Sequence, residues 1–188
     1  MGKGYYLKGE SIDVSQKIFL LFDELNAFKE DLYNSFLSNL SDNIQVDIFF
    51  HHFSYDMFSK LICDNIGSYN YYVLIPANFI QTDKVIKKLP HDKVYILDQT
   101  HKELKQYPAV YQNFEDDIYN SLKRAITLLN KYQKIVLLFP EKKQPQGMLV
   151  GFQKFRKNTN FQHEVINTLE NRILEKGEVY LVLDDQNL

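Results

Sequence analysis

The sequence has little cysteine, no tryptophan and no excess of basic residues. Its single thiol, Cys63, excludes an internal disulfide and favours a reducing compartment. With a formal net charge of -2, the chain lacks the basic excess of a nucleic-acid-binding module. No apolar run approaches the roughly 20 residues that span a bilayer, and no apolar segment typical of a signal peptide follows Met1. We therefore expect a cytoplasmic protein without a membrane partner.

Motifs that mark common enzymes are also absent. The sequence has no GxGxxG, GxxxxGK[ST], GxSxG or HExxH pattern. We therefore expect no enzyme, no catalytic residues, no cofactor and no metal ion. Two pairs of adjacent residues could still suggest a metal site. Adjacent histidines such as His51 and His52 at a strand end point to opposite sides, which disfavours a shared metal. Asp184 and Asp185 can hold Mg²⁺, but no phosphate loop accompanies them.

An unbroken apolar run is the clearest feature that is present. Residues 18–22 do not alternate with polar residues, which is typical of a strand covered on both faces of a parallel sheet. We predict a strand over residues 17–22 and a helix over about 27–40, with Asn26 suited to its N-cap. The apolar stripe of this helix is Phe28, Leu32, Phe36 and Leu40.

The same strand-and-helix unit recurs along the chain. We predict further strands over residues 45–50, 71–75 and 94–97. The intervening helices are expected from Ser54 to Ile66, stopping at Gly67, and over residues 83–88. Buried strands that alternate with amphipathic helices favour an α/β fold with a parallel sheet and right-handed crossovers.

A second series follows an irregular stretch at residues 99–109. Residues 109–111 are either a short strand or a crossing segment. We then predict a long helix over 116–132, a strand over 135–139, a helix over 148–157, an edge strand over 161–167 and a strand over 179–183. We therefore expect two α/β lobes, over residues 11–110 and 111–188, and an incomplete second lobe that continues beyond Leu188.

Polar side chains follow most of these predicted strands. In open α/β sheets, ligands bind beyond the carboxyl ends of the strands. Carboxylates and amides placed there suit the hydroxyl groups of a sugar. Asn26 and Asn78 serve equally well as helix caps, so this alternative stays open. The predicted ligand-binding residues are Asp23, Asn26, His52, Asn78, Asp98 and Asp184, with Phe28 and Phe152 available to stack on an apolar sugar face.

Several segments together resemble the effector-binding region of LacI-type transcription regulators. Val110-Tyr111 and Glu115-Asp116-Asp117 resemble the family's crossing into the second lobe. Leu149-Val150-Gly151-Phe152 resembles its helix with a Gly-aromatic pair, and residues 180–186 resemble its strand that ends in an Asp pair. The resemblance implies two lobes of the periplasmic-binding-protein type around a sugar-sized cleft. The family often has a ligand-binding arginine where this chain has Met148, so that role does not carry over.

The N-terminus carries a second resemblance. Gly2-Lys3-Gly4-Tyr5-Tyr6-Leu7 resembles the last wing strand of a GntR-type winged helix. This implies that residues 1–10 are a wing strand and linker, and that DNA is bound through a winged-helix domain preceding this chain. It also implies a homodimer whose DNA binding responds to a sugar-like effector. The alternatives are a solute-binding protein for transport of a sugar-like ligand and a metal-dependent α/β enzyme.

Overall fold

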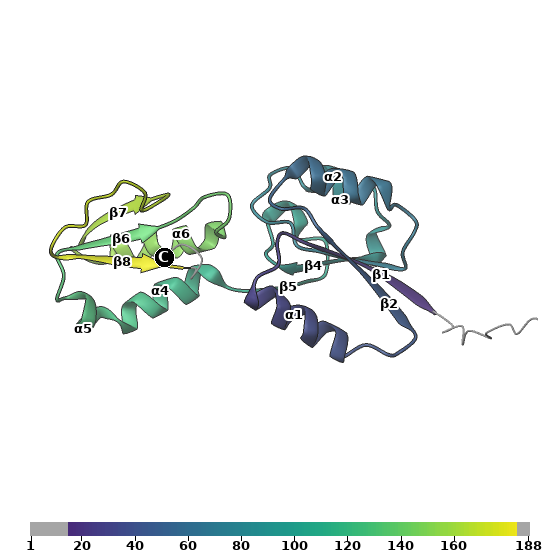
Figure 1. Ribbon diagram of the computed structural model, residues 1–188, viewed down its shortest axis with the longest axis horizontal. Helices are drawn as coiled ribbons and strands as arrows, with labels where there is room; N and C mark the ends of the chain where they lie inside the picture. Colours follow the sequence, from purple (N-terminus) through teal and green to yellow (C-terminus); the bar gives the residue numbers. More distant parts are fainter. Residues whose placement is uncertain (1–14, 184–188) are drawn as a thin grey trace, which may run out of the picture.

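The computed structural model describes residues 15–183. It contains two α/β lobes that follow one another along the chain, each with its own parallel sheet (Figure 1). The predicted fold class is therefore confirmed. The GntR-like residues 1–10 and the proposed ligand contact Asp184 lie outside the described residues, so both stay predictions.

The first lobe holds a five-stranded parallel sheet in the order β2-β1-β3-β4-β5. Its strands are β1 (Gln16–Phe22), β2 (Ile44–Phe50), β3 (Tyr71–Leu74), β4 (Val94–Asp98) and β5 (Ala109–Tyr111). The last of these settles the segment left open above, because it pairs in parallel with β4. The strand order reverses between β1 and β3, and ligands of such sheets bind at this switch point.

Helices cover both faces of the first sheet. They are α1 (Ala27–Ser38), α2 (Tyr55–Asp64) and α3 (Asp83–Ile86), with short 3₁₀ turns η1 (His91–Lys93) and η2 (Lys102–Leu104). α2 and α3 lie on one face, and α1 lies on the other (Figure 1). Both faces of β1 are therefore buried, which explains why residues 18–22 are apolar without alternation.

The first-lobe helices begin and end close to the predicted positions. The Ser54 hydroxyl accepts a hydrogen bond from the Met57 backbone N–H at 3.3 Å, so the predicted cap of α2 is confirmed. α2 ends at Asp64, slightly before the predicted Ile66. Gly67 has a φ of +80°, the left-handed conformation that lets a glycine end the turn after this helix.

The second lobe holds a three-stranded parallel sheet in the order β7-β6-β8. Its strands are β6 (Lys134–Leu138), β7 (Gln162–Ile166) and β8 (Glu178–Val182). Its helices are α4 (Phe114–Arg124), α5 (Ile126–Leu129) and α6 (Gln146–Lys157). β7 lies at an edge of the sheet, as predicted. Among residues 15–183, no helix is both long and apolar enough to cross a membrane.

The long helix predicted over 116–132 is wrong in detail, because the structure has two helices there. Asn113 caps α4, and the chain leaves helical geometry at Ala125, where φ is -80° and ψ is 2°. The predicted stripe still faces the core: Leu122 and Leu129 are buried with Ile135 and Leu137 of β6. The break was invisible in the sequence because both helices keep the same face on the core.

Gly151 allows α6 to pack closely on α4. A Cβ atom at this position would lie 2.3 Å from the backbone oxygen of Glu115. The next residue, Phe152, is 1% exposed and belongs to the core that α4 and α6 form against β6. The Gly-aromatic pair thus brings two helices together and fills the space beneath them.

Candidate ligand-binding cleft

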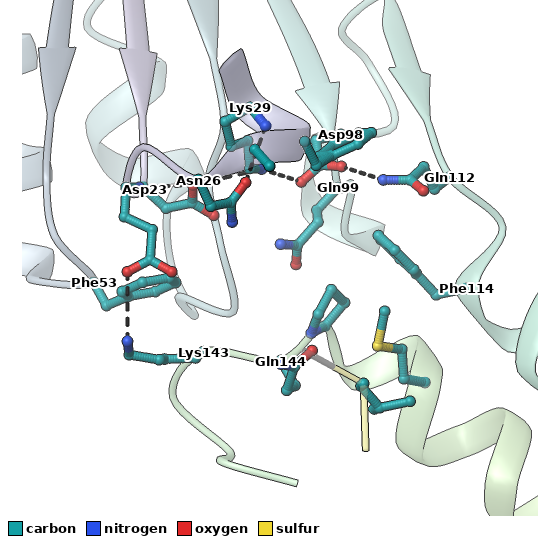
Figure 2. A pocket seen from close by; sticks show the side chains of 16 residues that line it. Asp23, Asn26, Lys29, Phe53, Asp98, Gln99, Gln112, Phe114, Lys143 and Gln144 are labelled. Atoms are coloured by element: carbon teal, nitrogen blue, oxygen red, sulfur yellow. Dashed lines mark hydrogen bonds and ion pairs between the residues drawn. The ribbon is translucent and has the colours of Figure 1, made fainter. Parts of the chain in front are cut away.

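A cavity of about 590 Å³ lies between the two lobes (Figure 2). The first lobe contributes residues at or just after the ends of β1, β2, β4 and β5 and the first turn of α1. The second lobe contributes the loop before α6, together with Phe114, Met148 and Leu183. The polar side chains of the lining are Asp23, Glu24, Asn26, Lys29, Asp98, Gln99, Gln112, Lys143 and Gln144.

A buried lysine between two carboxylates lies at the floor of this cavity. Lys29 is only 4% exposed, and Asp23 and Asp98 are also buried. The ammonium Nζ lies 2.5 Å from Asp98 Oδ2 and 3.4 Å from Asp23 Oδ1. Separating these three side chains would leave a buried charge without a partner, which costs several kcal/mol, so the three stay together. The ends of β1 and β4 are thereby joined through the first turn of α1.

Asp98 has one further side-chain contact and an unusual backbone conformation. Its Oδ1 accepts a hydrogen bond of 2.7 Å from the Gln112 side-chain amide, which follows β5. Its φ of +67° lies in the left-handed region, where a non-glycine residue costs about 1–3 kcal/mol. Aspartate tolerates this region better than most residues. Strain of this kind is concentrated at functional sites, and here it falls on a residue that lines the cavity.

Asn26 both caps a helix and lies at the cavity. Its Oδ1 accepts a hydrogen bond of 3.0 Å from the Lys29 backbone N–H, so it caps α1. It also lines the cavity, and its side-chain nitrogen is directed into the open space (Figure 2). Because the cap occupies only the oxygen, the amide nitrogen is left to donate to a ligand.

Three aromatic rings complete the lining. Phe28 is 47% exposed and lines the cavity, although the helical spacing placed it on the apolar stripe of α1. Phe53 follows β2, and Phe114 begins α4. Aromatic faces pack well against the apolar C–H faces of a sugar ring, while the surrounding amides and carboxylates bind its hydroxyl groups.

One ion pair crosses the mouth of the cleft. Lys143 Nζ in the second lobe lies 3.5 Å from Glu24 Oε2 in the first lobe. The same ammonium lies 5.9 Å from the centre of the Phe53 ring. Both side chains are partly exposed, so the pair contributes little to stability. It nevertheless neutralises the cation that the second lobe brings to the cavity.

Asn78 joins the lobes beside the cavity rather than lining it. Its amide nitrogen donates to the backbone oxygens of Glu141 at 3.1 Å and Gln144 at 2.5 Å. Its Oδ1 accepts from the Gln146 backbone N–H at 3.2 Å. Asn78 also lines a smaller cavity of about 230 Å³, which shares Gln99 and three other residues with the larger one. It does not cap α3, which follows Thr82.

Besides Asn78, two more of the predicted residues, His52 and Phe152, lie outside the cavity. His52 is exposed, and its ring stacks on that of Phe50. The chain turns at His52, where φ is +47°, and the next residue, Phe53, lines the cavity instead. Phe152 is buried in the second-lobe core, so its ring is not available to stack on a sugar. Of the predicted residues that are described, Asp23, Asn26, Phe28 and Asp98 are brought together.

His51, which follows β2, is fully buried. Its Nε2 lies 3.0 Å from the Ile75 backbone oxygen, so this nitrogen carries the proton and donates. Its Nδ1 has no hydrogen-bond partner within the described residues. Burial lowers the pKa of His51 below its ordinary value of 6.5, because a charged ring would be desolvated there. Within residues 15–183, no three His, Cys, Asp or Glu side chains are grouped as a metal site requires.

Several lining residues were missed by sequence reasoning. Lys29 carried the best signal, because a cation in the first turn of a helix opposes the helix dipole and needs a compensating partner. Phe53 follows a strand that was correctly predicted. Gln112, Phe114 and Gln144 lie in or next to connecting segments, where no periodicity marks which side chains face the cleft.

No family model matches this chain, and no curated protein is similar to it in sequence. Solved structures do share its fold. A LacI transcriptional regulator from Lactobacillus brevis is 18% identical with a TM-score of 0.61, over 80% of this chain and 57% of that one. A periplasmic solute-binding protein from Actinobacillus succinogenes with bound D-allose is 14% identical with a TM-score of 0.61, over 81% and 60%.

A third similar structure is a LacI family regulator from Lactobacillus casei with bound sucrose. It is 12% identical with a TM-score of 0.61, over 87% of this chain and 57% of that one. This chain therefore spans 57–60% of the length of these structures. At these identities the likeness establishes the fold, which is that of LacI-type regulators and periplasmic sugar-binding proteins.

Proposed function

We propose that this chain is the sugar-sensing region of a bacterial transcription regulator. One observation carries the proposal. The cavity between the lobes combines buried carboxylates and amides with the rings of Phe28, Phe53 and Phe114. This is the lining that a hydroxyl-rich ligand with apolar ring faces requires. Similar folds hold D-allose and sucrose in two of the structures described above.

The binding role is assigned to the residues that share the cavity. Asp23, Asp98 and the free amide nitrogen of Asn26 accept from and donate to hydroxyl groups, and Phe28 covers one face of the ring. The prediction for Asp184 is kept, since this residue follows Leu183, which lines the cavity. Asn78 is assigned a different role, which is to hold the two lobes in position through its hydrogen bonds to the second lobe.

The regulatory role rests on the coupling of ligand and lobe position. A ligand that contacts both lobes favours one closure angle, and a difference of a few kcal/mol in affinity is enough to invert the populations. In a cytoplasmic homodimer, closure changes the spacing of two DNA-binding domains. The resemblance of residues 2–7 to a GntR-type wing strand supports a winged helix as that domain.

The alternative is a solute-binding protein for transport, a class that has the same fold. The full-length gene product distinguishes the two. We expect it to bind DNA from its own promoter region in a mobility-shift assay, and we expect a sugar that raises its thermal stability to change that affinity. A full-length product that binds the sugar but has no affinity for any DNA of its own locus would support the transport role.

A further inference from the structure

We infer that the cleft accepts an uncharged polyhydroxylated ligand and rejects its phosphorylated and carboxylated counterparts. This inference rests on the proposed function and specifies the ligand class. It is drawn from the charges that line the cavity. Among residues 15–183, the lining has three carboxylates and two ammonium groups, from Asp23, Glu24, Asp98, Lys29 and Lys143, which sum to a formal charge of -1.

Both cations are already neutralised by the protein. Lys29 lies between Asp23 and Asp98, at 3.4 and 2.5 Å, and is buried with them. Lys143 is paired with Glu24 at 3.5 Å. No other Lys or Arg of residues 15–183 lines the cavity. A phosphate would therefore have to break one of these pairs to find a cation.

The start of α1 is only in part available to an anion. A helix N-terminus binds anions through its free N–H groups, but Asn26 Oδ1 already accepts from the Lys29 backbone N–H. An anion on the cavity floor would also meet the carboxylates of Asp23 and Asp98. A like charge in a partly buried site is disfavoured, because solvent no longer screens it.

Neutral hydroxyl groups match the same surface. A hydroxyl donates to a carboxylate and accepts from an amide, so one sugar can satisfy both kinds of group without displacing an ion pair. Gln99 and Gln144 supply amides from the two lobes, and Figure 2 shows the Gln99 amide directed into the cavity. The buried triad of Asp23, Lys29 and Asp98 can then remain intact when the ligand binds.

The test compares matched ligand pairs by calorimetry on the full-length protein. The probes are D-glucose, D-allose and sucrose, with D-glucose 6-phosphate, D-allose 6-phosphate and sucrose 6-phosphate as phosphorylated counterparts and D-glucuronate as a carboxylated one. We expect a neutral member to bind at least tenfold more tightly than each charged counterpart. A charged counterpart that binds as tightly or more tightly overturns the inference and leaves the sugar-sensing proposal standing. Binding of no probe overturns both.

A charge variant sharpens the test. Glu24→Gln removes the partner of Lys143 and frees a cation at the mouth of the cleft. We expect the ratio of neutral to phosphorylated affinity to fall roughly threefold to tenfold at low salt, and less at high salt. Asp64→Asn changes the net charge equally at an exposed pair with Lys60 and should not move the ratio. An unchanged ratio in Glu24→Gln contradicts the inference.

Discussion

Lys29 Nζ lies 2.5 Å from Asp98 Oδ2, although the two residues are 69 positions apart in the chain. The contact joins the first turn of α1 to the end of β4, and both side chains are buried. Asp23, at the end of β1, shares the same ammonium. Three separate segments thus build one rigid floor for the cleft before any ligand arrives, so little ordering is left for binding.

Removal of the cation from this floor should destabilise the first lobe. We expect Lys29→Met to lower the free energy of unfolding by about 3–5 kcal/mol, because two buried carboxylates lose their counter-ion. Urea denaturation followed by circular dichroism measures the change. Lys60→Met, which breaks an exposed pair with Asp64, should cost less than about 1 kcal/mol. Equal losses in the two variants would show that the buried triad has no special role.

Asn78 should control how the lobes are held. Asn78→Ala removes three hydrogen bonds to the second lobe, with a combined worth of roughly 1–3 kcal/mol. We expect a larger radius of gyration by small-angle X-ray scattering and weaker ligand binding. Asn39→Ala is the matched control, since that amide bonds to Ser35 in its own helix. An unchanged radius in Asn78→Ala would mean that other contacts set the lobe position.

Stability should fall in mildly acidic solution because of His51. Burial lowers the pKa of His51 in the folded protein, so the unfolded chain binds a proton that the folded chain does not. The free energy of unfolding is therefore greatest above pH 6.5 and falls as the pH drops towards the lowered pKa, by up to about 1.4 kcal/mol per pH unit. Urea titrations at pH 7.5, 6.5 and 5.5 measure this slope.

Two histidine variants test whether His51 causes this pH dependence of the free energy of unfolding. His51→Phe keeps a ring among Phe53, Phe58 and Phe79 and should flatten the dependence between pH 6.5 and 5.5. His52→Gln, at the exposed neighbouring position, should keep it. If both variants retain the wild-type slope, the acid sensitivity comes from another group.

A separate loss is expected in stronger acid. Hydrogen bonds from Arg172 and Lys134 lower the pKa of Glu164 to about 2 in the folded protein. The stabilisation is present above pH 4.5 and is lost as the pH falls from there towards 2, because the unfolded chain then binds the proton first. Glu164→Gln should reduce the acid dependence in this range. Identical dependence in the wild type and in the variant would exclude Glu164 as its source.

The close contact of α6 with α4 should not tolerate a larger residue at its centre. A Cβ at Gly151 would lie 2.3 Å from the backbone oxygen of Glu115, so one helix must move. We expect Gly151→Ala to destabilise the second lobe by about 1–3 kcal/mol. Val150→Ala, at a 44% exposed position on the same helix, should change stability by less. A neutral Gly151→Ala would indicate that the helices can separate freely.

The sequence predicted the fold better than the cleft. The apolar runs at residues 18–22 and 135–138 mark strands because burial on both faces dictates their composition. Asp23 and Asp98 were found because polar residues at strand ends of a parallel sheet converge on one edge. Lys29 was missed because a charged residue on a helix normally faces water, and only the tertiary structure reveals its two partners.

Contacts between the lobes were the least predictable. Asn78 was recognised as polar and well placed at the end of a strand. Its partners are backbone groups of Glu141, Gln144 and Gln146, in the loop before α6 and at the first residue of that helix, and no periodicity predicts the path of this loop. Phe28 and Phe152 looked alike in the sequence. One lines the cavity and the other fills a core, and the difference depends on which side of each helix the sheet lies.

The proposed ligand is an uncharged sugar that binds between the lobes. The most direct measurement is calorimetric titration of the full-length protein with the neutral sugars named above, for the wild type and for Asp98→Asn. We predict that at least one sugar binds the wild type and that Asp98→Asn binds it at least tenfold more weakly, because a hydroxyl loses a charged acceptor. Equal affinity in the wild type and Asp98→Asn, or no binding of any sugar, would contradict the account.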